Sequence, residues 1–276
     1  MAFIIKWNLS IGIVAFMAYV VQKIMGKRLG HYWRKIVWIL LTLKMCFPFW
    51  SVTEKFRQHP FMISMPAYYI GEQNQKTAIM TKMGNVSIRG WMSGEKFLPY
   101  IWIAGMILCL LFHAIQYRIW KKRIFAECKK MQKNSVLEAL KKASEVCKIK
   151  KTEIWVCENQ DFYSPMLFGV RNTKVLIPQE MLETENYSYE EWYLIFLHEL
   201  THQKKHDLWY KRFLQIIRDV YWFCIPMLWV QKMANIDIEC VCDETVTKHM
   251  NLTQRKDYCN VILKVASKQT KKELSG

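Results

Sequence analysis

Acidic residues are scarce in this chain of 276 residues, which has 23 Asp and Glu against 40 Lys and Arg and a formal net charge of +17. Such an excess raises the hypothesis of a nucleic-acid-binding protein. Much of the positive charge, however, lies directly beside long apolar runs. Attraction to anionic lipid head groups explains that placement more simply. We therefore expect the lipid bilayer as a partner and no direct contact with nucleic acid.

Two further absences concern export and redox state. No A-x-A cleavage site follows the first apolar run, which favours a retained membrane anchor over a cleaved signal peptide. None of the nine cysteines lies between residues 51 and 96. If that segment is outside the cell, the cysteines of the soluble part lie in a reducing compartment and are expected to be free thiols.

Three apolar runs occupy the amino-terminal part of the chain, and a mixed, charged sequence follows them. The first and third runs are long enough to cross a bilayer. The second is shorter and contains Lys44 and Pro48, and such an internal lysine can snorkel, pair or face the interior of a helix bundle. We predict a membrane domain at residues 1–120, with spans at about 3–25, 36–50 and 97–120 and a loop at 51–96, followed by a soluble domain at 121–276.

Basic residues indicate the orientation of these spans. They crowd the link between the first two runs and follow the third, at Lys27, Arg28, Arg34, Lys35, Arg118, Lys121, Lys122 and Arg123. The positive-inside rule places both clusters in the cytoplasm. The loop at 51–96 is then extracellular, and the soluble domain of this multi-pass cell-membrane protein is cytoplasmic.

The most informative motif is Leu197-His198-Glu199-Leu200-Thr201-His202. Ser188 and Glu191 have the spacing of a capping box, so a helix is predicted to begin there. On that helix His198 and His202 leave the same face one turn apart, able to hold one metal ion between them. Glu199 projects where it can touch a water bound to that ion. This is the H-E-x-x-H arrangement of a zinc peptidase.

A catalytic zinc site needs three protein ligands and one open position. His206 lies eight residues beyond His198, about 12 Å along a continuous helix, which is too far to share the ion. The glycine and later histidine of the metzincin pattern are missing. Pro226 is expected to open a further helix, on which Glu239 and Asp243 share one face. We predict Glu239 as the third ligand and Asp243 as a hydrogen-bond partner of a ligand imidazole, the alternative being two acids on a solvated helix face.

Two cysteines downstream of this helix are further candidate ligands. Cys240 and Cys242 form a C-x-C pair, which splays the thiols apart on a helix and fits no zinc finger or ribbon. We interpret both as buried small side chains.

Several local elements are predicted around the motif: an amphipathic helix at 135–147, strands at 152–157, 164–169 and 174–178, and a helical tail from Asn251. A small sheet directly before the metal helix suggests a use. An extended peptide can add itself to a sheet edge, which holds its scissile carbonyl over the metal. The alternative is a sheet that only packs.

In order along the chain, these features resemble the BlaR/MecR membrane metallopeptidases, which are signal-transducing antirepressors. The resemblance rests on the three apolar runs, Ser164–Gly169, Val175–Pro178, the H-E-x-x-H motif with His206-Asp207, Tyr221-Trp222-Phe223 with Pro226 and Trp229, and Glu239–Glu244. It implies a mainly α membrane protein with three amino-terminal transmembrane helices and a cytoplasmic α+β gluzincin domain. His198, His202 and Glu239 would bind zinc, the only cofactor expected, and Glu199 would be the general base. The implied substrate is a cytoplasmic DNA-binding repressor, often with self-cleavage.

Two departures limit the resemblance. The turn between the two strand motifs lacks a proline that is common there in relatives. Drug-sensing relatives also continue into a fourth span and an extracellular penicillin-binding sensor, whereas this chain stops at Gly276. We expect either a fragment or a short member with another input, and we do not predict β-lactam binding. A housekeeping HtpX-like protease and a non-catalytic zinc-binding receptor remain alternatives. The oligomeric state is open, a homodimer being one arrangement.

Overall fold

The computed structural model describes residues 11–20, 23, 30–46, 97–149, 152–158, 164–170, 172–183 and 187–273. The predicted loop at 51–96 lies outside these ranges, as do the two ends of the first predicted span and the end of the second.

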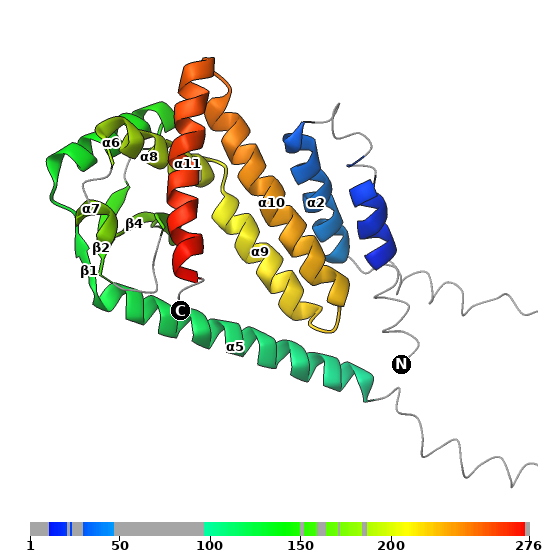
Figure 1. Cartoon of the computed structure of the whole chain (residues 1–276). Helices are drawn as coiled ribbons and strands as arrows, with labels where there is room; N and C mark the ends of the chain where they lie inside the picture. The colour runs from blue at the N-terminus through cyan, green and yellow to red at the C-terminus, as the bar shows by residue number, and fades with distance from the viewer. Residues whose placement is uncertain are drawn as a thin grey trace, which may run out of the picture.

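Helices predominate, and one small sheet lies at one end of the molecule (Figure 1). The labelled elements are, in chain order, α2 (His31–Cys46), α5 (Leu98–Ala126), β1 (Cys128–Lys130), α6 (Asn134–Cys147), β2 (Glu153–Cys157), β3 (Met166–Phe168), β4 (Lys174–Pro178), α7 (Glu180–Glu183), α8 (Tyr189–Lys204), α9 (Asp207–Val220), α10 (Ile225–Thr247) and α11 (Leu252–Glu273). Within the described ranges, Tyr100–Ala126 is the one helix long and apolar enough to cross a membrane, and Ile11–Val20 is a shorter apolar helix. The mainly α fold is thus confirmed, and the three-span arrangement stays a prediction.

The sheet has the strand order β1-β2-β4-β3. β2 and β4 are parallel, and the two outer pairs are antiparallel. Alternate side chains such as Ile154, Val175 and Ile177 enter a core that α6 and α8 share. β3 is an edge strand of this sheet and contacts α8. The sheet and α6 therefore support the helix that carries the H-E-x-x-H motif.

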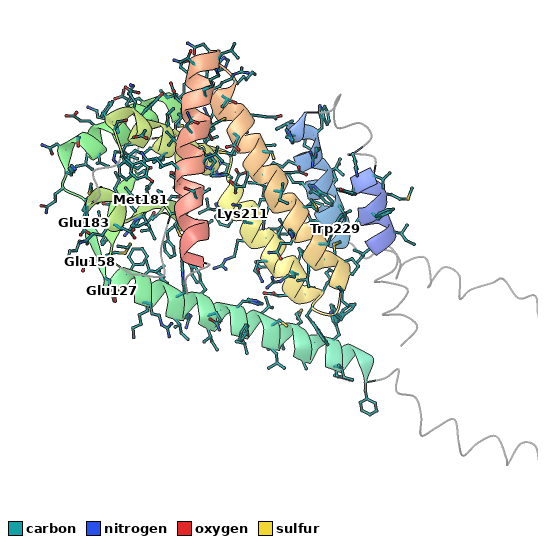
Figure 2. The ribbon with its side chains drawn as sticks, in the orientation of Figure 1. Glu127, Glu158, Met181, Glu183, Lys211 and Trp229 are labelled. Carbon is teal, nitrogen blue, oxygen red and sulfur yellow. A yellow bond between two sulfur atoms is a disulfide. The ribbon has the colours of Figure 1, made fainter. Side chains whose placement is uncertain are left out.

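A second apolar core joins α2 to the α9–α10 pair. Trp38 of α2 is fully buried and meets Trp229 of α10 edge to face, with ring centroids 5.9 Å apart. Trp229 is labelled in Figure 2. Leu214 of α9 and Met227 of α10 are buried in the same cluster. A helix from the predicted membrane part therefore packs directly on the predicted soluble part, and the domain boundary at residue 120 stays a prediction.

The long helix α5 lies beside α9 and the turn that follows it (Figure 1). Trp102 of α5 donates its indole N–H to the carbonyl of Val220 at 2.8 Å, and Trp222 donates to the carbonyl of Trp102 at 3.3 Å. Gly105 permits this approach, because a Cβ there would clash with the Trp222 ring. The connection at residues 221–224, between α9 and α10, is thus held against α5, and Pro226 lies in the first turn of α10.

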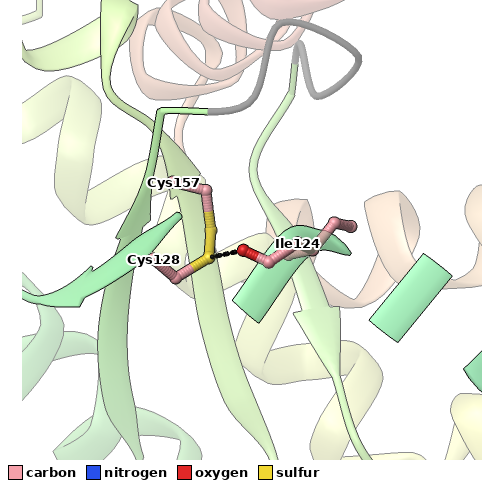
Figure 3. The surroundings of a disulfide bond; sticks show 3 residues. All are labelled: Ile124, Cys128 and Cys157. Atoms are coloured by element: carbon pink, nitrogen blue, oxygen red, sulfur yellow. Dashed lines mark hydrogen bonds between the residues drawn. A yellow bond between two sulfur atoms is a disulfide. The ribbon is translucent and has the colours of Figure 1, made fainter. Parts of the chain in front are cut away.

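Cys128 and Cys157 form a disulfide between β1 and β2 (Figure 3). They occupy directly paired positions of the two antiparallel strands, with Cα atoms 4.1 Å apart. The expectation of reduced thiols throughout the soluble part is therefore wrong for this pair. Strand β1 was not predicted, so the pairing of the two cysteines could not be anticipated.

Candidate metal centre

Helix α8 begins where the capping box predicted. The Ser188 side chain accepts from the Glu191 amide at 3.2 Å, and the Glu191 carboxylate accepts from the Ser188 amide at 2.7 Å. One face of α8, including Phe196 and Leu200, is buried in the sheet-side core. His198 and His202 lie one turn apart, with ring centroids 4.8 Å apart. The cap and the apolar face together fix the direction in which both imidazoles point.

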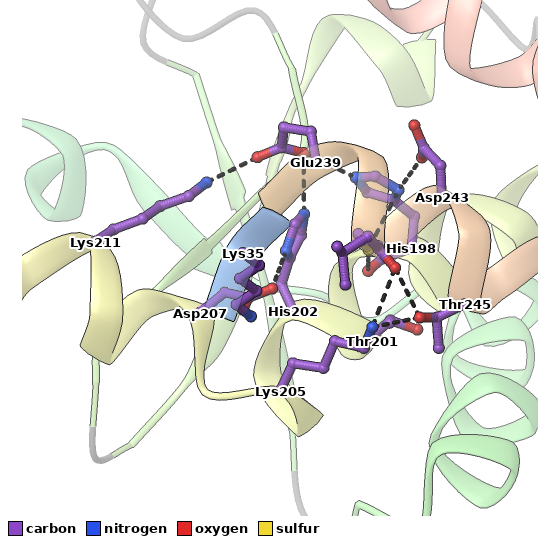
Figure 4. A network of polar contacts seen from close by, with 12 residues as sticks. Lys35, His198, Thr201, His202, Lys205, Asp207, Lys211, Glu239, Asp243 and Thr245 are labelled. Atoms are coloured by element: carbon purple, nitrogen blue, oxygen red, sulfur yellow. Dashed lines mark hydrogen bonds and ion pairs between the residues drawn. The ribbon is translucent and has the colours of Figure 1, made fainter. Parts of the chain in front are cut away.

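Helix α10 brings Glu239 against the two imidazoles (Figure 4). Its Oε2 lies 3.1 Å from Nε2 of His202 and 3.6 Å from Nε2 of His198. Its Oε1 accepts from Nζ of Lys211, on α9, at 2.8 Å. Two ring nitrogens and one carboxylate oxygen therefore converge on one point, from helices that are far apart in the sequence.

The opposite ring nitrogens have their own partners. Nδ1 of His202 lies 2.8 Å from Oδ2 of Asp207, and Nδ1 of His198 lies 2.8 Å from the hydroxyl of Tyr258 and 3.3 Å from Oδ1 of Asp243. The Tyr258 hydroxyl donates to Asp243 at 2.6 Å, so it accepts from His198. Acceptors on Nδ1 fix the tautomer that leaves Nε2 free to ligate a metal. Asp243 thus lies where it was predicted to act, whereas Asp207 and Tyr258 were missed as partners.

Asp207 reaches His202 because the chain breaks between α8 and α9. The helix ends at Lys204, and His206 adopts a left-handed conformation with φ of 56°. The continuous helix assumed for His206 was therefore wrong, although His206 is not part of the described metal-ligand cluster. Neither glycine nor proline marks this break, so the sequence carried no usable signal for it.

Cys242 is a second candidate ligand that sequence analysis treated as packing. It is fully buried, and its Sγ lies 3.7 Å from Nδ1 of His198. Donor atoms of His198, His202 and Cys242 all lie within 4.8 Å of one another. The chain therefore offers two donor sets, both of types that suit zinc. Glu239 faces both Nε2 atoms and is half exposed, so a site formed with Glu239 leaves room for a water molecule. Cys242 instead lies beside Nδ1 of His198, which already has a hydrogen bond with Tyr258.

The charges around the two histidines favour a bound cation. Burial alone would lower the pKa of His202, but hydrogen bonds, led by that with Asp207, raise its pKa to about 11. Burial would raise the pKa of Glu239, but hydrogen bonds with His198 and His202 hold it far below its usual range. The carboxylates thus draw positive charge onto the imidazoles. A divalent metal ion that replaces the imidazole protons would be attracted by the same carboxylates.

Glu199 follows His198 on α8 and is partly buried. Burial raises the pKa of its carboxyl group, an effect that the charges of the two neighbouring histidines oppose. A carboxylate with a raised pKa beside a metal site has the proton affinity that a general base requires.

Comparison with known proteins supports a peptidase family. A family model described as BlaR1 peptidase M56 matches residues 2–275. The methicillin resistance mecR1 proteins of Staphylococcus aureus and Staphylococcus epidermidis are each 29% identical over 165 residues, which is 59% of this chain and 27% of theirs. Regulatory protein BlaR1 of Bacillus licheniformis is 34% identical over 105 residues, 38% of this chain and 17% of its own length.

These relatives are much longer than the regions they share with this chain, which spans about a quarter of the mecR1 proteins and a sixth of BlaR1. The family match, by contrast, extends over nearly all of the chain. The chain therefore belongs to the M56 family of BlaR1 peptidases.

Proposed function

We propose that this protein is an integral membrane zinc metalloendopeptidase of the antirepressor type, which relays an outside signal by cleaving a cytoplasmic DNA-binding repressor and itself. The observation that carries the proposal is the convergence of Nε2 of His198, Nε2 of His202 and Oε2 of Glu239, with both Nδ1 atoms engaged elsewhere. The family membership and the names of the relatives, which refer to regulation and methicillin resistance, agree with it.

The three side chains would hold zinc, which supplies Lewis acidity for a water nucleophile and the substrate carbonyl. Glu199 accepts a proton from the attacking water and delivers it to the leaving amine nitrogen. Asp207 fixes the ring of His202, and Tyr258 with Asp243 fixes that of His198. Orientation of ligand imidazoles by such partners maintains the geometry of the site.

The edge strand β3 is the proposed place for the substrate. It pairs with β4 on one side and contacts α8, so a peptide added along its other side would run past the metal helix. Main-chain hydrogen bonds hold an extended peptide in this way without demanding a particular sequence. The substrate is accordingly an extended, locally unfolded segment of the repressor.

The orientation remains part of the proposal, with spans at 3–25, 36–50 and 97–120 and residues 121–276 in the cytoplasm. The Cys128–Cys157 disulfide argues against a cytoplasmic location of this domain, because the cytosol keeps thiols reduced. The redox state of this pair in growing cells therefore tests the orientation, because a cytoplasmic domain requires free thiols. Thiol trapping before lysis, followed by a gel-shift reagent, measures this. A disulfide already present in cells would argue for an outward-facing domain.

The test of function is co-expression with the repressor encoded nearest to this chain. Wild type, Glu199→Gln and Glu190→Gln are compared by immunoblot of both proteins, with zinc content measured on the purified chain. Glu190 is an exposed residue of the same helix, paired with Lys142, and serves as the matched control. We expect fragments with wild type and Glu190→Gln, and none with Glu199→Gln at full zinc content. Cleavage by Glu199→Gln would refute the proposed base, and zinc without any cleavage would favour a non-catalytic receptor.

A further inference from the structure

Helix α2 reaches the metal centre through Lys35. This lysine is buried, and its Nζ donates to Oδ1 of Asp207, which is fully buried on α9 (Figure 4). The other carboxylate oxygen of Asp207 lies 2.8 Å from Nδ1 of His202. Lys35, Asp207 and His202 thus form a continuous chain of contacts from the predicted membrane part to the metal-binding face of α8.

The same helix also contacts the element that carries Glu239. Arg34 forms an ion pair with Asp237 at 2.8 Å, and Trp38 donates its indole N–H to Asp237 at 2.6 Å. Asp237 is buried on α10, two residues before Glu239. Helix α2 therefore supplies charged partners to α9 and to α10, the two helices beside the histidines. Its position beside the site is fixed by the contacts with Asp207 and Asp237.

The arrangement at Asp207 has a definite physical requirement. A carboxylate with no solvent exposure needs a cation or several donors, because an uncompensated buried charge is costly. Here each oxygen has one partner, Lys35 on one side and His202 on the other. Removing the ammonium leaves the carboxylate free to rotate. Nδ1 of His202 then loses a fixed acceptor.

We propose that Lys35 is a positioning residue of the peptidase, through which α2 sets the orientation of His202 by way of Asp207. The inference rests on the proposed function in taking His202 as a zinc ligand. Because α2 overlaps the second predicted span, a displacement of that helix withdraws the ammonium from Asp207. The membrane part then controls the metal site without touching the metal or the substrate.

The test uses the full chain in detergent or nanodiscs, with Lys35→Met, Lys35→Arg and the control Lys232→Met, which changes an exposed lysine of α10. Zinc affinity is measured by chelator competition, and cleavage of the co-expressed repressor is measured in parallel. We expect Lys35→Met to weaken zinc binding about tenfold, as loss of an outer partner of a ligand does, and to slow cleavage. Lys35→Arg restores most of both, and Lys232→Met matches wild type.

A double variant separates positioning from general stability. If Lys35 acts through Asp207, Lys35→Met adds little further loss of zinc affinity to Asp207→Asn. Losses that multiply, or a lowered unfolding temperature with unchanged zinc affinity, would overturn the inference. Failure of the proposed function gives a different result. A wild-type chain that binds zinc but cuts nothing refutes the peptidase assignment, while zinc affinity still decides the role of Lys35. A wild-type chain that binds no zinc refutes both.

Discussion

The half of the molecule built from α6, α8 and the sheet has an interior of apolar side chains, whereas the half built from α2, α9 and α10 also contains buried charges. Within the described ranges, the buried lysine and aspartate side chains all lie in this second half, at Lys35, Asp207, Asp219 and Asp237. Apolar packing is non-directional and holds α8 in one close-packed place. Ion pairs between separate helices, in contrast, depend on both partners being present. The candidate metal centre lies where these two kinds of support meet.

The largest expected effect comes from opening a cavity in the apolar half. Ile177 of β4 is fully buried, so Ile177→Ala should lower the free energy of unfolding by about 4 kcal/mol. Zinc affinity of the folded fraction should stay unchanged, because Ile177 packs in the core that the sheet shares with α6 and α8 and is not a proposed ligand. Urea unfolding followed by tryptophan fluorescence, with chelator competition, measures both. Zinc binding that weakened in step with stability would abolish the distinction between the two halves.

A slightly smaller loss of stability is expected from the charged half. Asp237→Ala removes the acceptor of the Trp38 indole and the ion-pair partner of Arg34, at a cost of about 3 kcal/mol. Unlike Ile177→Ala, it should also weaken zinc binding, because α10 carries Glu239 close by. The same two measurements apply. Unchanged zinc affinity here would show that α2 stabilises α10 without influencing the site.

The two donor sets are separated by a pair of ligand variants. Glu239→Ala should weaken zinc binding by more than about a hundredfold, beyond the effect of losing an outer partner. Cys242→Ala should leave zinc affinity within about threefold, because Sγ adjoins Nδ1 of His198 and not the converging Nε2 atoms. Chelator competition on both variants decides. The reverse ranking would assign the third ligand to Cys242.

The smallest effect is expected at the start of α8. Ser188→Ala removes the side-chain acceptor of the Glu191 amide and should cost about 1 kcal/mol. Ser188→Asp, which keeps an acceptor at this position, is the control and should retain wild-type stability. Zinc affinity should be unaffected in both, because the cap lies about three turns from the first histidine and the apolar face of α8 holds the helix. A shift in zinc affinity would show that the cap, rather than the core, sets the position of the histidines.

The elements that were predicted are those whose signals are local. Local signals include the capping box at Ser188, the proline near the start of α10 and the short apolar runs of β2 and β4, each of which depends on a few neighbouring residues. The spacing of His198 and His202 is equally local. What surrounds the two histidines was not predictable in this way, apart from the carboxylates of α10.

The missed features depend on contacts between distant segments or on an unmarked break. Lys35 and Asp207 are 172 residues apart, and Cys128 and Cys157 are 29 apart on a strand pair whose first member is only three residues long. The left-handed residue that separates α8 from α9 is a histidine, where glycine would have been the visible signal. The contact between Asp207 and Nδ1 of His202 follows from that break, so it was missed with it.

The packing of α2 on α9 and α10 also bears on how the peptidase part is obtained. A fragment that begins at residue 121 would expose the apolar surface that Trp38 covers and would leave Asp207 and Asp237 without Lys35 and Arg34. Such a fragment should aggregate or misfold when produced alone. Supplying a separate peptide that contains His31–Cys46 should rescue its solubility, because the amino-terminal helix serves as a template on which the remainder of the chain folds.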